Sequence, residues 1–344
     1  MKTFIGIDVS LASSAFCVLD EHGQILKEAQ VASEPEAFVE YLRSLPEPIE
    51  AIGLEAGPLS QWLHRGLAEA GIDATLLETR RVKAVLKAMP VKTDRRDAEG
   101  IARLLRMGWF RPVHCKSVSA QELRALLSTR RALQKAVLDI EQSLRGVLRN
   151  FGLKLGPISK GRYEEHVREL VSGNNMLEAA SQAVLGARDR LRHELAGVER
   201  QLRDLARQDQ ACRLMMTMPG VGALVALTVR AAIDDPSRFR SSRSVGPWAG
   251  LTPRREQSGE RDIVGHITKA GDPTLRTALF NAATVLMHRA RPSWLKAWGM
   301  QVAKRRGQKR ATVAVARRIG VILHRMWVDG AGFRMVREGN GVAA

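Results

Sequence analysis

Four acids in the first hundred residues occupy positions where they could share metal ions. Asp8 ends an apolar run in GIDVS, and Glu55 ends another in GLEAG. Asp94 and Asp97 are three residues apart, which places both on one face of a helix that Thr93 could cap. Clustered carboxylates repel one another, so a site holding all four would favour hard divalent cations. Two such ions about 4 Å apart can activate an attacking oxygen and steady a leaving one in phosphodiester chemistry.

Each acid taken alone has a simpler explanation. An aspartate at a strand end is more often a turn or cap residue than a ligand, and Asp94 and Asp97 could pair with neighbouring basic residues at a helix N-terminus. The combination on a first strand, a fourth strand and a later helix is more specific, because an RNase H-like nuclease fold brings distant carboxylates together in this way. We expect a basic loop beside these acids to hold a phosphate backbone. Its residues are Arg80, Arg81, Lys83, Lys87, Lys92, Arg95 and Arg96.

A second chemical candidate is Ser258, which precedes a glycine in a segment rich in Gly and Arg. Its hydroxyl could attack a phosphodiester while neighbouring cations stabilise the charge that builds on the phosphate. Those cations are Arg254, Arg255, Arg261 and Lys269. A Ser-Gly pair in a loop is often only a turn, and three further serines compete for the role. They are Ser241, Ser242 and Ser244.

Two further features favour contact with a nucleic-acid backbone. The sequence PGVG at residues 219–222 resembles the turn of a helix-hairpin-helix element, in which the amides of Gly220 and Gly222 could hold a phosphate without reading sequence. A tight turn between helices, with no ligand, is the alternative. A basic stretch without acids follows near the C-terminus. It contains Lys304, Arg305, Arg306, Lys309, Arg310, Arg317 and Arg318.

Composition agrees with a polyanionic partner. The 344 residues predict about two domains, and 54 Lys and Arg against 36 Asp and Glu leave a net charge of +18. The apolar run 214–229 is broken by proline and glycines and is too short to span a membrane. Neither a signal peptide nor a disulfide or zinc pattern is present. We therefore expect a cytoplasmic protein without membrane contact.

The acids need elements to position them. Residues 3–30 predict three short strands in an antiparallel meander, followed by a helix at 36–45, a strand at 49–54, a helix at 59–70 and a strand at 74–77. This alternation predicts a mixed sheet with helices packed on it. The fold class expected for the whole chain is α/β plus α, with the sheet domain at 1–115.

The middle of the chain, 116–208, predicts a helical coiled-coil region. Heptad repeats span 123–147 and 177–205, with Arg130 and Arg188 in core positions. A turn is expected at 152–175, and the repeats fit packing within one chain as well as between chains. The remainder, 209–344, predicts a mostly α domain with a helix at 223–233, loops at 234–271 and two closing helices near 272–289 and 312–327.

Taken together, these motifs resemble those of the DEDD transposases of bacterial insertion sequences, the serine-containing, RNA-guided bridge recombinases. The resemblance rests on Asp8, Glu55, Asp94 and Asp97, on the heptad-bearing middle, on PGVG, and on GLTPRR, SG, ITK, GD and LR in that order from residue 250. It extends over nearly the whole chain. One departure is His266, where relatives often carry a different residue.

The resemblance implies a RuvC-like domain that binds Mg²⁺ through Asp8, Glu55, Asp94 and Asp97. It implies a coiled coil for assembly into a dimer or tetramer, and a C-terminal transposase domain whose nucleophile, Ser258, forms a 5′-phosphoserine link before strands are exchanged. Donor and target DNA, and a noncoding guide RNA that pairs with both, are the implied partners, and the implied location is the nucleoid of a bacterium. The nucleic-acid contacts that we expect are Arg80, Arg81, Lys92, Arg95, Arg96, Gly220, Gly222, Arg254, Arg255, Lys269 and Arg276.

Three other functions are open at this point. A junction-resolving nuclease of the RuvC type would need the four carboxylates but no serine. The GID motif also opens the fold of sugar kinases and actin-like ATPases, although no second phosphate loop is found. A purely architectural DNA-binding protein would make the carboxylates dispensable.

Overall fold

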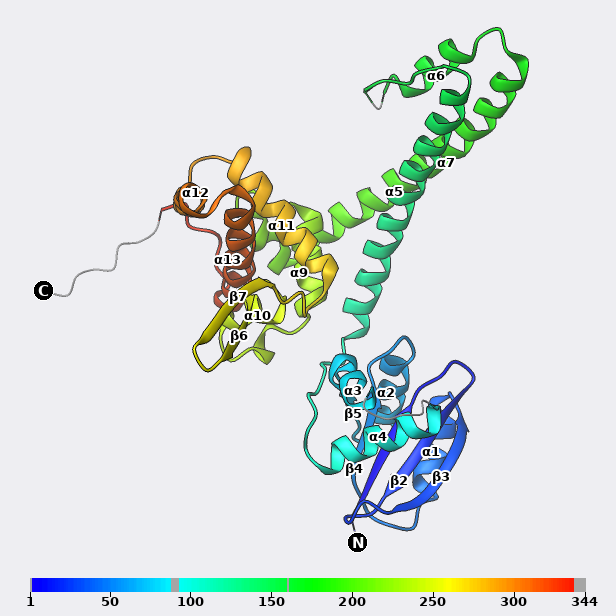
Figure 1. Ribbon diagram of the computed structural model, residues 1–344, viewed down its shortest axis with the longest axis vertical. Coiled ribbons are helices and arrows are strands. Elements are labelled where there is room, and N and C mark those ends of the chain that lie inside the picture. The colour runs from blue at the N-terminus through cyan, green and yellow to red at the C-terminus, as the bar shows by residue number, and fades with distance from the viewer. Residues whose placement is uncertain (1, 88–92, 160, 337–344) are drawn as a thin grey trace, which may run out of the picture. The chain divides into compact units, whose positions relative to one another are not determined.

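The computed structural model describes residues 2–87, 93–159 and 161–336. The chain divides into two compact units, Met1–Lys116 and Ser117–Ala344 (Figure 1). The helical middle and the C-terminal part that we expected as separate domains both lie in the second unit. The division into 1–115, 116–208 and 209–344 therefore stays a prediction.

The first unit is built on a five-stranded mixed sheet with the order β3-β2-β1-β4-β5. The strands are β1 (Thr3–Asp8), β2 (Ser13–Leu19), β3 (Ile25–Ala32), β4 (Ile49–Glu55) and β5 (Thr75–Leu77). The first three strands form the predicted antiparallel meander, and β4 and β5 run parallel to β1. The mixed sheet expected from the alternation of strands and helices is confirmed.

Helices cover both faces of this sheet. They are α1 (Pro35–Arg43), α2 (Ser60–Glu69), α3 (Thr79–Leu86) and α4 (Asp94–Arg106). Successive side chains of β2 point to opposite faces, so Phe16 packs edge-on against Phe38 of α1, whereas Cys17 packs with Ala98 and Ala102 of α4. Helix α3 corrects the sequence prediction, which placed Arg80 in a loop.

Two long helices dominate the start of the second unit. Helices α5 (Val118–Asn150) and α7 (Asn175–Gln208) pack against each other within one chain. The two arginines in heptad core positions each find an acid on the facing helix: Arg130 pairs with Glu199 at 2.6 Å, and the buried Arg188 pairs with Glu141 at 2.7 Å. The expected turn between them contains α6 (Tyr163–Val171). A coiled coil between chains stays a prediction.

The rest of the second unit is mostly helical, as expected, but it has more regular structure than we predicted. Its elements are α8 (Gln210–Met216), α9 (Ala223–Ile233), the 3-10 helices η1 (Pro236–Arg238) and η2 (Ser242–Ser244), α10 (Val245–Trp248), β6 (Pro253–Ser258), β7 (Arg261–Ile267), α11 (Pro273–His288), α12 (Trp294–Arg306) and α13 (Gln308–Asp329). The segment expected as loops contains a β-hairpin, whose residues are exposed on both faces and so lack an alternating apolar pattern. Within residues 268–336, three helices rather than two follow the hairpin, and the last two are separated at Gly307, where φ is +81°.

Buried apolar side chains of α8, α9, α11 and α13 form the main core of this unit, together with Leu295 of α12. The thiols Cys17, Cys115 and Cys212 are all free, and burial raises the pKa of Cys17 to about 11. Among the described residues, no helix combines the length and the apolar character that crossing a membrane requires.

Candidate active site and nucleic-acid interface

The first two acids lie at the ends of neighbouring parallel strands. Strands β1 and β4 pair in register from Phe4 to Ile7, with Ile7 opposite Leu54. Asp8 and Glu55 are the next residue of each strand, and adjacent strands lie about 4.8 Å apart. Both side chains are half-buried. The structure therefore brings together two acids that are 47 positions apart in the sequence.

Both acids point to the face of the sheet that α4 covers. Side chains two residues apart in a strand share a face, so Asp8 shares one with Gly6, and Glu55 with Gly53. A Cβ atom on Gly6 would clash with the backbone carbonyl oxygen of Ala98 in α4. A Cβ atom on Gly53 would lie 2.7 Å from a methyl group of Leu105 in the same helix. Glycine at these two positions lets α4 lie directly on the strands that carry the acids.

The other two acids occupy the first turn of α4. Thr93 caps this helix as predicted, because its hydroxyl accepts a hydrogen bond from the Arg96 amide at 3.3 Å. Asp97 is buried, with 9% of its surface exposed, and it directly precedes the residue that contacts Gly6. Asp94 is exposed. The two acids therefore differ in environment, although their spacing placed them on one side of the helix.

The described part of the chain contains no group of three or more His, Cys, Asp or Glu side chains arranged to hold a metal ion. Carboxylate oxygens are nevertheless the ligands that Mg²⁺ prefers. Asp8 and Glu55 fit such an ion in chemistry and in their shared position at the strand ends, with the acids of the α4 first turn on the same face of the sheet. The four-ligand, two-ion site stays a prediction.

The basic residues near these acids have different surroundings. Arg95 forms an ion pair with Glu28 of β3, so its charge is partly neutralised within the protein. Arg96 in α4 and Arg80 in α3 are exposed. Lys92 lies outside the described residues, and the structure does not describe the side chain of Arg81.

Ser258 is the last residue of β6, at the tip of a hairpin with a two-residue turn. It pairs with Arg261 across the turn, and the first turn residue, Gly259, has a φ of +55° that favours glycine. All residues of β6 are exposed, and the hairpin packs its strands mainly against each other. The serine that we expected in a loop therefore stands at the end of an exposed two-stranded ribbon (Figure 1).

The register of the ribbon sorts its arginines onto two faces. Ser258 shares a face with Arg254 and with its cross-strand partner Arg261. Arg255 lies on the opposite face, where its guanidinium donates two hydrogen bonds to Asp262, at 2.8 and 2.6 Å. These hydrogen bonds hold the pKa of Asp262 below its usual range. The strand pairing therefore singles out Arg261, which the sequence named only as one of several nearby cations.

Packing explains one of the two glycines of the PGVG turn. Gly220 has a φ of +88°, and a Cβ atom there would lie 2.5 Å from the carbonyl oxygen of Ala282 in α11. Gly222 is exposed and precedes the first residue of α9, with no heavy atom within 4 Å of a Cβ built on it. Close packing against α11 therefore accounts for Gly220, whereas Gly222 has open space at the helix N-terminus.

Two further residues of the expected interface lie where the hairpin joins α11. Lys269 has a φ of +54°, in a bend that packs tightly against Gly250. The Arg276 guanidinium donates hydrogen bonds to the backbone carbonyls of Ala249 and Gly271. Arg276 therefore holds the bend closed, a structural role that the sequence pattern did not reveal.

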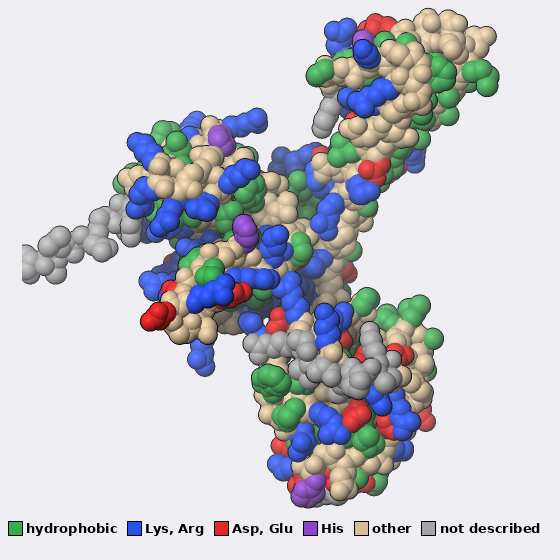
Figure 2. All heavy atoms as spheres, viewed as in Figure 1, with side chains coloured by type: hydrophobic (Ala, Val, Ile, Leu, Met, Phe, Trp, Pro, Cys, Tyr) green, Lys and Arg blue, Asp and Glu red, His purple; other side chains and the backbone are tan. Residues whose placement is uncertain are grey.

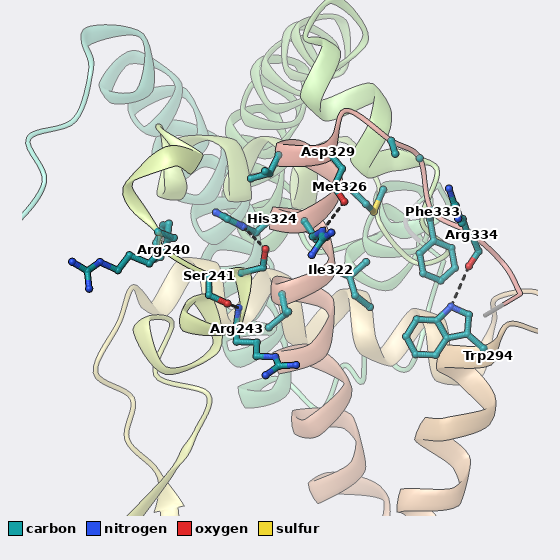
Figure 3. A pocket seen from close by; sticks show the side chains of 17 residues that line it. Arg240, Ser241, Arg243, Trp294, Ile322, His324, Met326, Asp329, Phe333 and Arg334 are labelled. Carbon is teal, nitrogen blue, oxygen red and sulfur yellow. Dashed lines mark hydrogen bonds and ion pairs between the residues drawn. The ribbon is translucent and has the colours of Figure 1, made fainter. Parts of the chain in front are cut away.

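One of the three competing serines has a partner that the sequence could not suggest. The buried His324 of α13 lies 2.8 Å from the Ser242 hydroxyl through Nδ1 and 3.0 Å from the Pro236 carbonyl oxygen through Nε2. Figure 3 shows His324 with a dashed line for the first of these contacts. The carbonyl can only accept, so Nε2 donates to it, and in the neutral ring Nδ1 then accepts from the Ser242 hydroxyl. The two residues are 82 positions apart, and this pair fastens η1 and η2 to α13.

Models of known protein families match residues in both units of the chain. A family model described as Transposase matches residues 5–152, and a model described as Transposase IS116/IS110/IS902 family matches residues 212–298. The chain is 30% identical to the transposase for insertion sequence element IS1111A of Coxiella burnetii, over 93% of this chain and 88% of that protein. It is 28% identical to a probable family 20 transposase of Pseudomonas aeruginosa, over 93% of this chain and 95% of that protein. It is also 28% identical to a pilin gene-inverting protein of Moraxella bovis, over 48% of this chain and 54% of that protein.

Proposed function

We infer the reaction from the family: the chain belongs to the IS110-type family of DEDD insertion-sequence transposases and is a DNA transposase. We propose that it cuts and rejoins DNA through a covalent bond to Ser258, assisted by metal ions that its carboxylates hold. The observation that carries the metal half of this proposal is the placement of Asp8 and Glu55 at the ends of adjacent parallel strands. The first turn of α4, with Asp94 and Asp97, covers the same face of the sheet.

The four carboxylates would hold Mg²⁺. When bound, the metal supplies positive charge that favours ionisation of an attacking hydroxyl and stabilises a leaving oxygen. The protein's own contribution is rigidity: β1 and β4 fix two of the acids by backbone pairing, and the Thr93 cap fixes the start of α4. Ligands held by regular elements keep their positions better than ligands on loops.

Ser258 would be the nucleophile. Its Oγ attacks a backbone phosphorus, the Oγ–P bond forms, and the bond from phosphorus to the 3′ oxygen breaks. The hydroxyl proton leaves to a base, and the 3′ oxygen takes up a proton to become a free 3′-hydroxyl. A 3′-hydroxyl from another strand then attacks the phosphoserine, which rejoins DNA and restores the serine. The exposed hairpin tip supports this role, because a duplex can approach it.

We propose that donor and target DNA are paired by a guide RNA encoded by the element, and that the chain acts as a dimer or tetramer through its long helices. The net charge of +18 supports polyanionic partners. Similarity to a protein named for inverting a pilin gene supports a reaction that exchanges DNA strands. The alternative is a RuvC-like, metal-dependent, junction-resolving nuclease, which would use the carboxylates without a serine intermediate.

The test of the nucleophile is Ser258→Ala, assayed with Mg²⁺, the element's RNA and matching DNA. We expect strand cleavage to fall at least about 10³-fold and the protein–DNA adduct to disappear, because the attacking oxygen is gone. Peptide mass spectrometry of the wild-type adduct should locate DNA on Ser258. Ser244→Ala is the control, as a serine of the same unit outside the hairpin. Undiminished cleavage by Ser258→Ala would favour the nuclease alternative.

The test of the acids is Asp8→Asn and Glu55→Gln. Each change keeps the size of the side chain but removes the charge that a cation needs, so we expect cleavage to fall at least about 100-fold. Glu50→Gln is a matched control, because Glu50 lies in the same strand as Glu55 and pairs at the surface with Lys2. Full activity in both variants would show that the carboxylates are dispensable. Omitting the RNA tests the guide separately, and cleavage at matching DNA should then be lost.

A further inference from the structure

Two adjoining cavities follow one side of α13. The larger has a volume of about 910 Å³ and the smaller about 470 Å³. Arg243 and Val321 line both, so the cavities form one continuous groove, which we call the α13 groove. Its sides come from α12 and from the segment 239–252, and Figure 3 shows the larger part with Trp294 on one side and Arg240 on the other.

The α13 groove is strongly basic. Arg240, Arg243 and Arg317 line it and are exposed. Among the described lining residues the one acid is Asp329, which is bound to Arg325 at 2.6 Å. The sequence from 273 to 328, which includes α11, α12 and most of α13, contains no Asp or Glu. In Figure 2, Lys and Arg side chains far outnumber acidic ones over this helical part of the molecule. Such a surface attracts polyanions.

Two consecutive arginines of the α13 groove are braced by neighbouring side chains and backbone. The aliphatic stem of Arg317 passes over Gly246 so closely that a Cβ atom there would lie 2.9 Å from its Cγ. The Arg318 guanidinium lies 4.1 Å from the ring centre of Trp298 and 5.5 Å from that of Trp294. An unbraced surface arginine loses side-chain entropy when it binds an anion. Bracing before binding reduces that loss, as expected of a formed binding site.

The shape and the side chains of the groove favour one kind of polyanion. The backbone of a duplex is a broad convex surface, whereas these cavities are of the size that proteins use for single small groups such as a nucleotide. Aromatic residues Phe239, Trp294 and Phe333 line the larger cavity beside the arginines. Arginines for phosphates together with aromatic surfaces for bases are the combination that binds unpaired strands.

We propose that the α13 groove binds an unpaired polynucleotide strand. This site is separate from the reaction proposed above, because it uses neither the carboxylates of the first unit nor Ser258. An RNA strand and a DNA strand offer the same phosphates and bases, and the experiment compares them directly.

The test is the double charge reversal Arg243→Glu with Arg317→Glu, measured by fluorescence anisotropy in EDTA. The unpaired probes are a labelled oligouridylate and a labelled oligothymidylate of about 12 nucleotides each, a length within the range that single-strand sites cover. The third probe is a labelled duplex of about 12 base pairs. We expect affinity for the unpaired probes to fall at least about tenfold, because the two arginines contact their phosphates in the groove. Affinity for the duplex should fall less than about threefold, because a duplex does not enter the groove and loses only general attraction. The uridylate arm against the thymidylate arm shows whether the groove prefers RNA or DNA.

The matched control is Arg289→Glu with Arg291→Glu, which makes the same change in charge at two exposed positions between α11 and α12, outside the lining residues. It should leave affinity for unpaired strands within about threefold of wild type, since only general attraction is reduced. Equal losses in the two double variants, or a larger loss for duplex than for unpaired strands, would overturn the proposal. If the charge reversal unfolds the protein, Arg317→Gln against Arg289→Gln makes the same comparison.

The result is independent of catalysis. Binding is measured without metal, and Asp8→Asn should bind the unpaired probes as wild type does. Loss of cleavage with normal strand binding would therefore concern the active site, and loss of strand binding in Arg243→Glu with Arg317→Glu would concern the groove.

Discussion

Ser258 and Arg261 face each other across the hairpin turn, on the same side of the ribbon. In the reaction proposed above, an arginine in that position can hold the phosphate that Ser258 would attack, because a guanidinium donates two parallel hydrogen bonds to phosphate oxygens. Arg255 lies on the opposite side of the ribbon, where Asp262 engages its guanidinium. The two arginines therefore provide a comparison within one hairpin.

We predict that Arg261→Ala lowers formation of the Ser258–DNA adduct at least about 100-fold, because a charge-stabilising donor is removed. Arg261→Lys should recover only part of that loss, since an ammonium keeps the charge but not the forked geometry. Arg255→Ala is the control and should change the rate less than about threefold, because exposed ion pairs contribute little. Quantifying the adduct on denaturing gels measures all three. A larger effect for Arg255→Ala than for Arg261→Ala would contradict the assignment of faces.

Between elements, the placement of the acids depends on how closely α4 lies on the sheet. The helix passes over Gly6 of β1 at backbone distance, and Ala98 and Ala102 make that approach possible. Any side chain at position 6 would separate the helix from the strand that carries Asp8. The position of Asp8 relative to α4 therefore depends on the glycine at position 6.

We predict that Gly6→Ala destabilises the protein by about 1–3 kcal/mol, because the new methyl group meets backbone atoms that cannot move independently. Urea unfolding, followed by circular dichroism, measures the change. Gly57→Ala is the control, since the nearest atom to a Cβ built there is 3.9 Å away. An unchanged midpoint for Gly6→Ala would mean that α4 lies farther from β1 than described.

A second contact between elements joins α5 to α11. Asp272 caps α11 by accepting a hydrogen bond from the Thr274 amide at 2.7 Å, and its other oxygen accepts one from the Arg124 guanidinium at 2.7 Å. Burial alone would raise the pKa of Asp272, but the Arg124 guanidinium and the backbone amides outweigh it and hold the pKa below its usual value.

Because the folded protein holds this pKa below the unfolded value of about 3.9, the contribution of Asp272 is fully present above that pH and is lost as pH falls through the folded pKa. We predict that Asp272→Asn lowers the free energy of unfolding by about 1–2 kcal/mol at about pH 7. The difference from wild type should stay constant down to about pH 4 and narrow below it. Urea titrations across that range measure it, and a difference that grows on acidification would refute the prediction.

Charge is the dominant property of the molecule as a whole. The net charge of +18 is unevenly distributed along the chain, since residues 273–328 contain no acid at all. Cations that are not neutralised by nearby acids release counterions when they bind a phosphate backbone. General attraction to nucleic acid therefore belongs to the entire molecule, whereas the α13 groove is a local feature.

We predict that affinity for duplex DNA falls at least about 10³-fold between about 50 and 200 mM salt, as expected when six or more phosphates are contacted. Anisotropy titrations at several salt concentrations give the slope of log affinity against log salt. Asp8→Asn should leave that slope unchanged, because the acid makes no such contact. A slope near zero would show that the positive charge does not face the DNA.

Much of the fold can be predicted from local pattern. The meander, β4 and β5, the Thr93 cap and the two long helices follow from apolar periodicity and capping residues, which act over a few positions. Such a pattern does not reveal the exposed β6–β7 hairpin or α12, because neither buries a regular apolar stripe. Helix α3 has only eight residues, and its basic residues led us to expect a loop there.

Sequence alone establishes which groups are available: four carboxylates, a serine beside a glycine, two arginines in heptad core positions and an excess of positive charge. Which of these groups meet depends on the fold. Strand pairing sets Asp8 beside Glu55 and Arg261 opposite Ser258, and helix packing gives Arg130 and Arg188 their acids. Some of these contacts join residues that are far apart in the chain, and others depend on strand register. Distant contacts and strand register both follow from the packing of whole elements, which a local pattern does not contain.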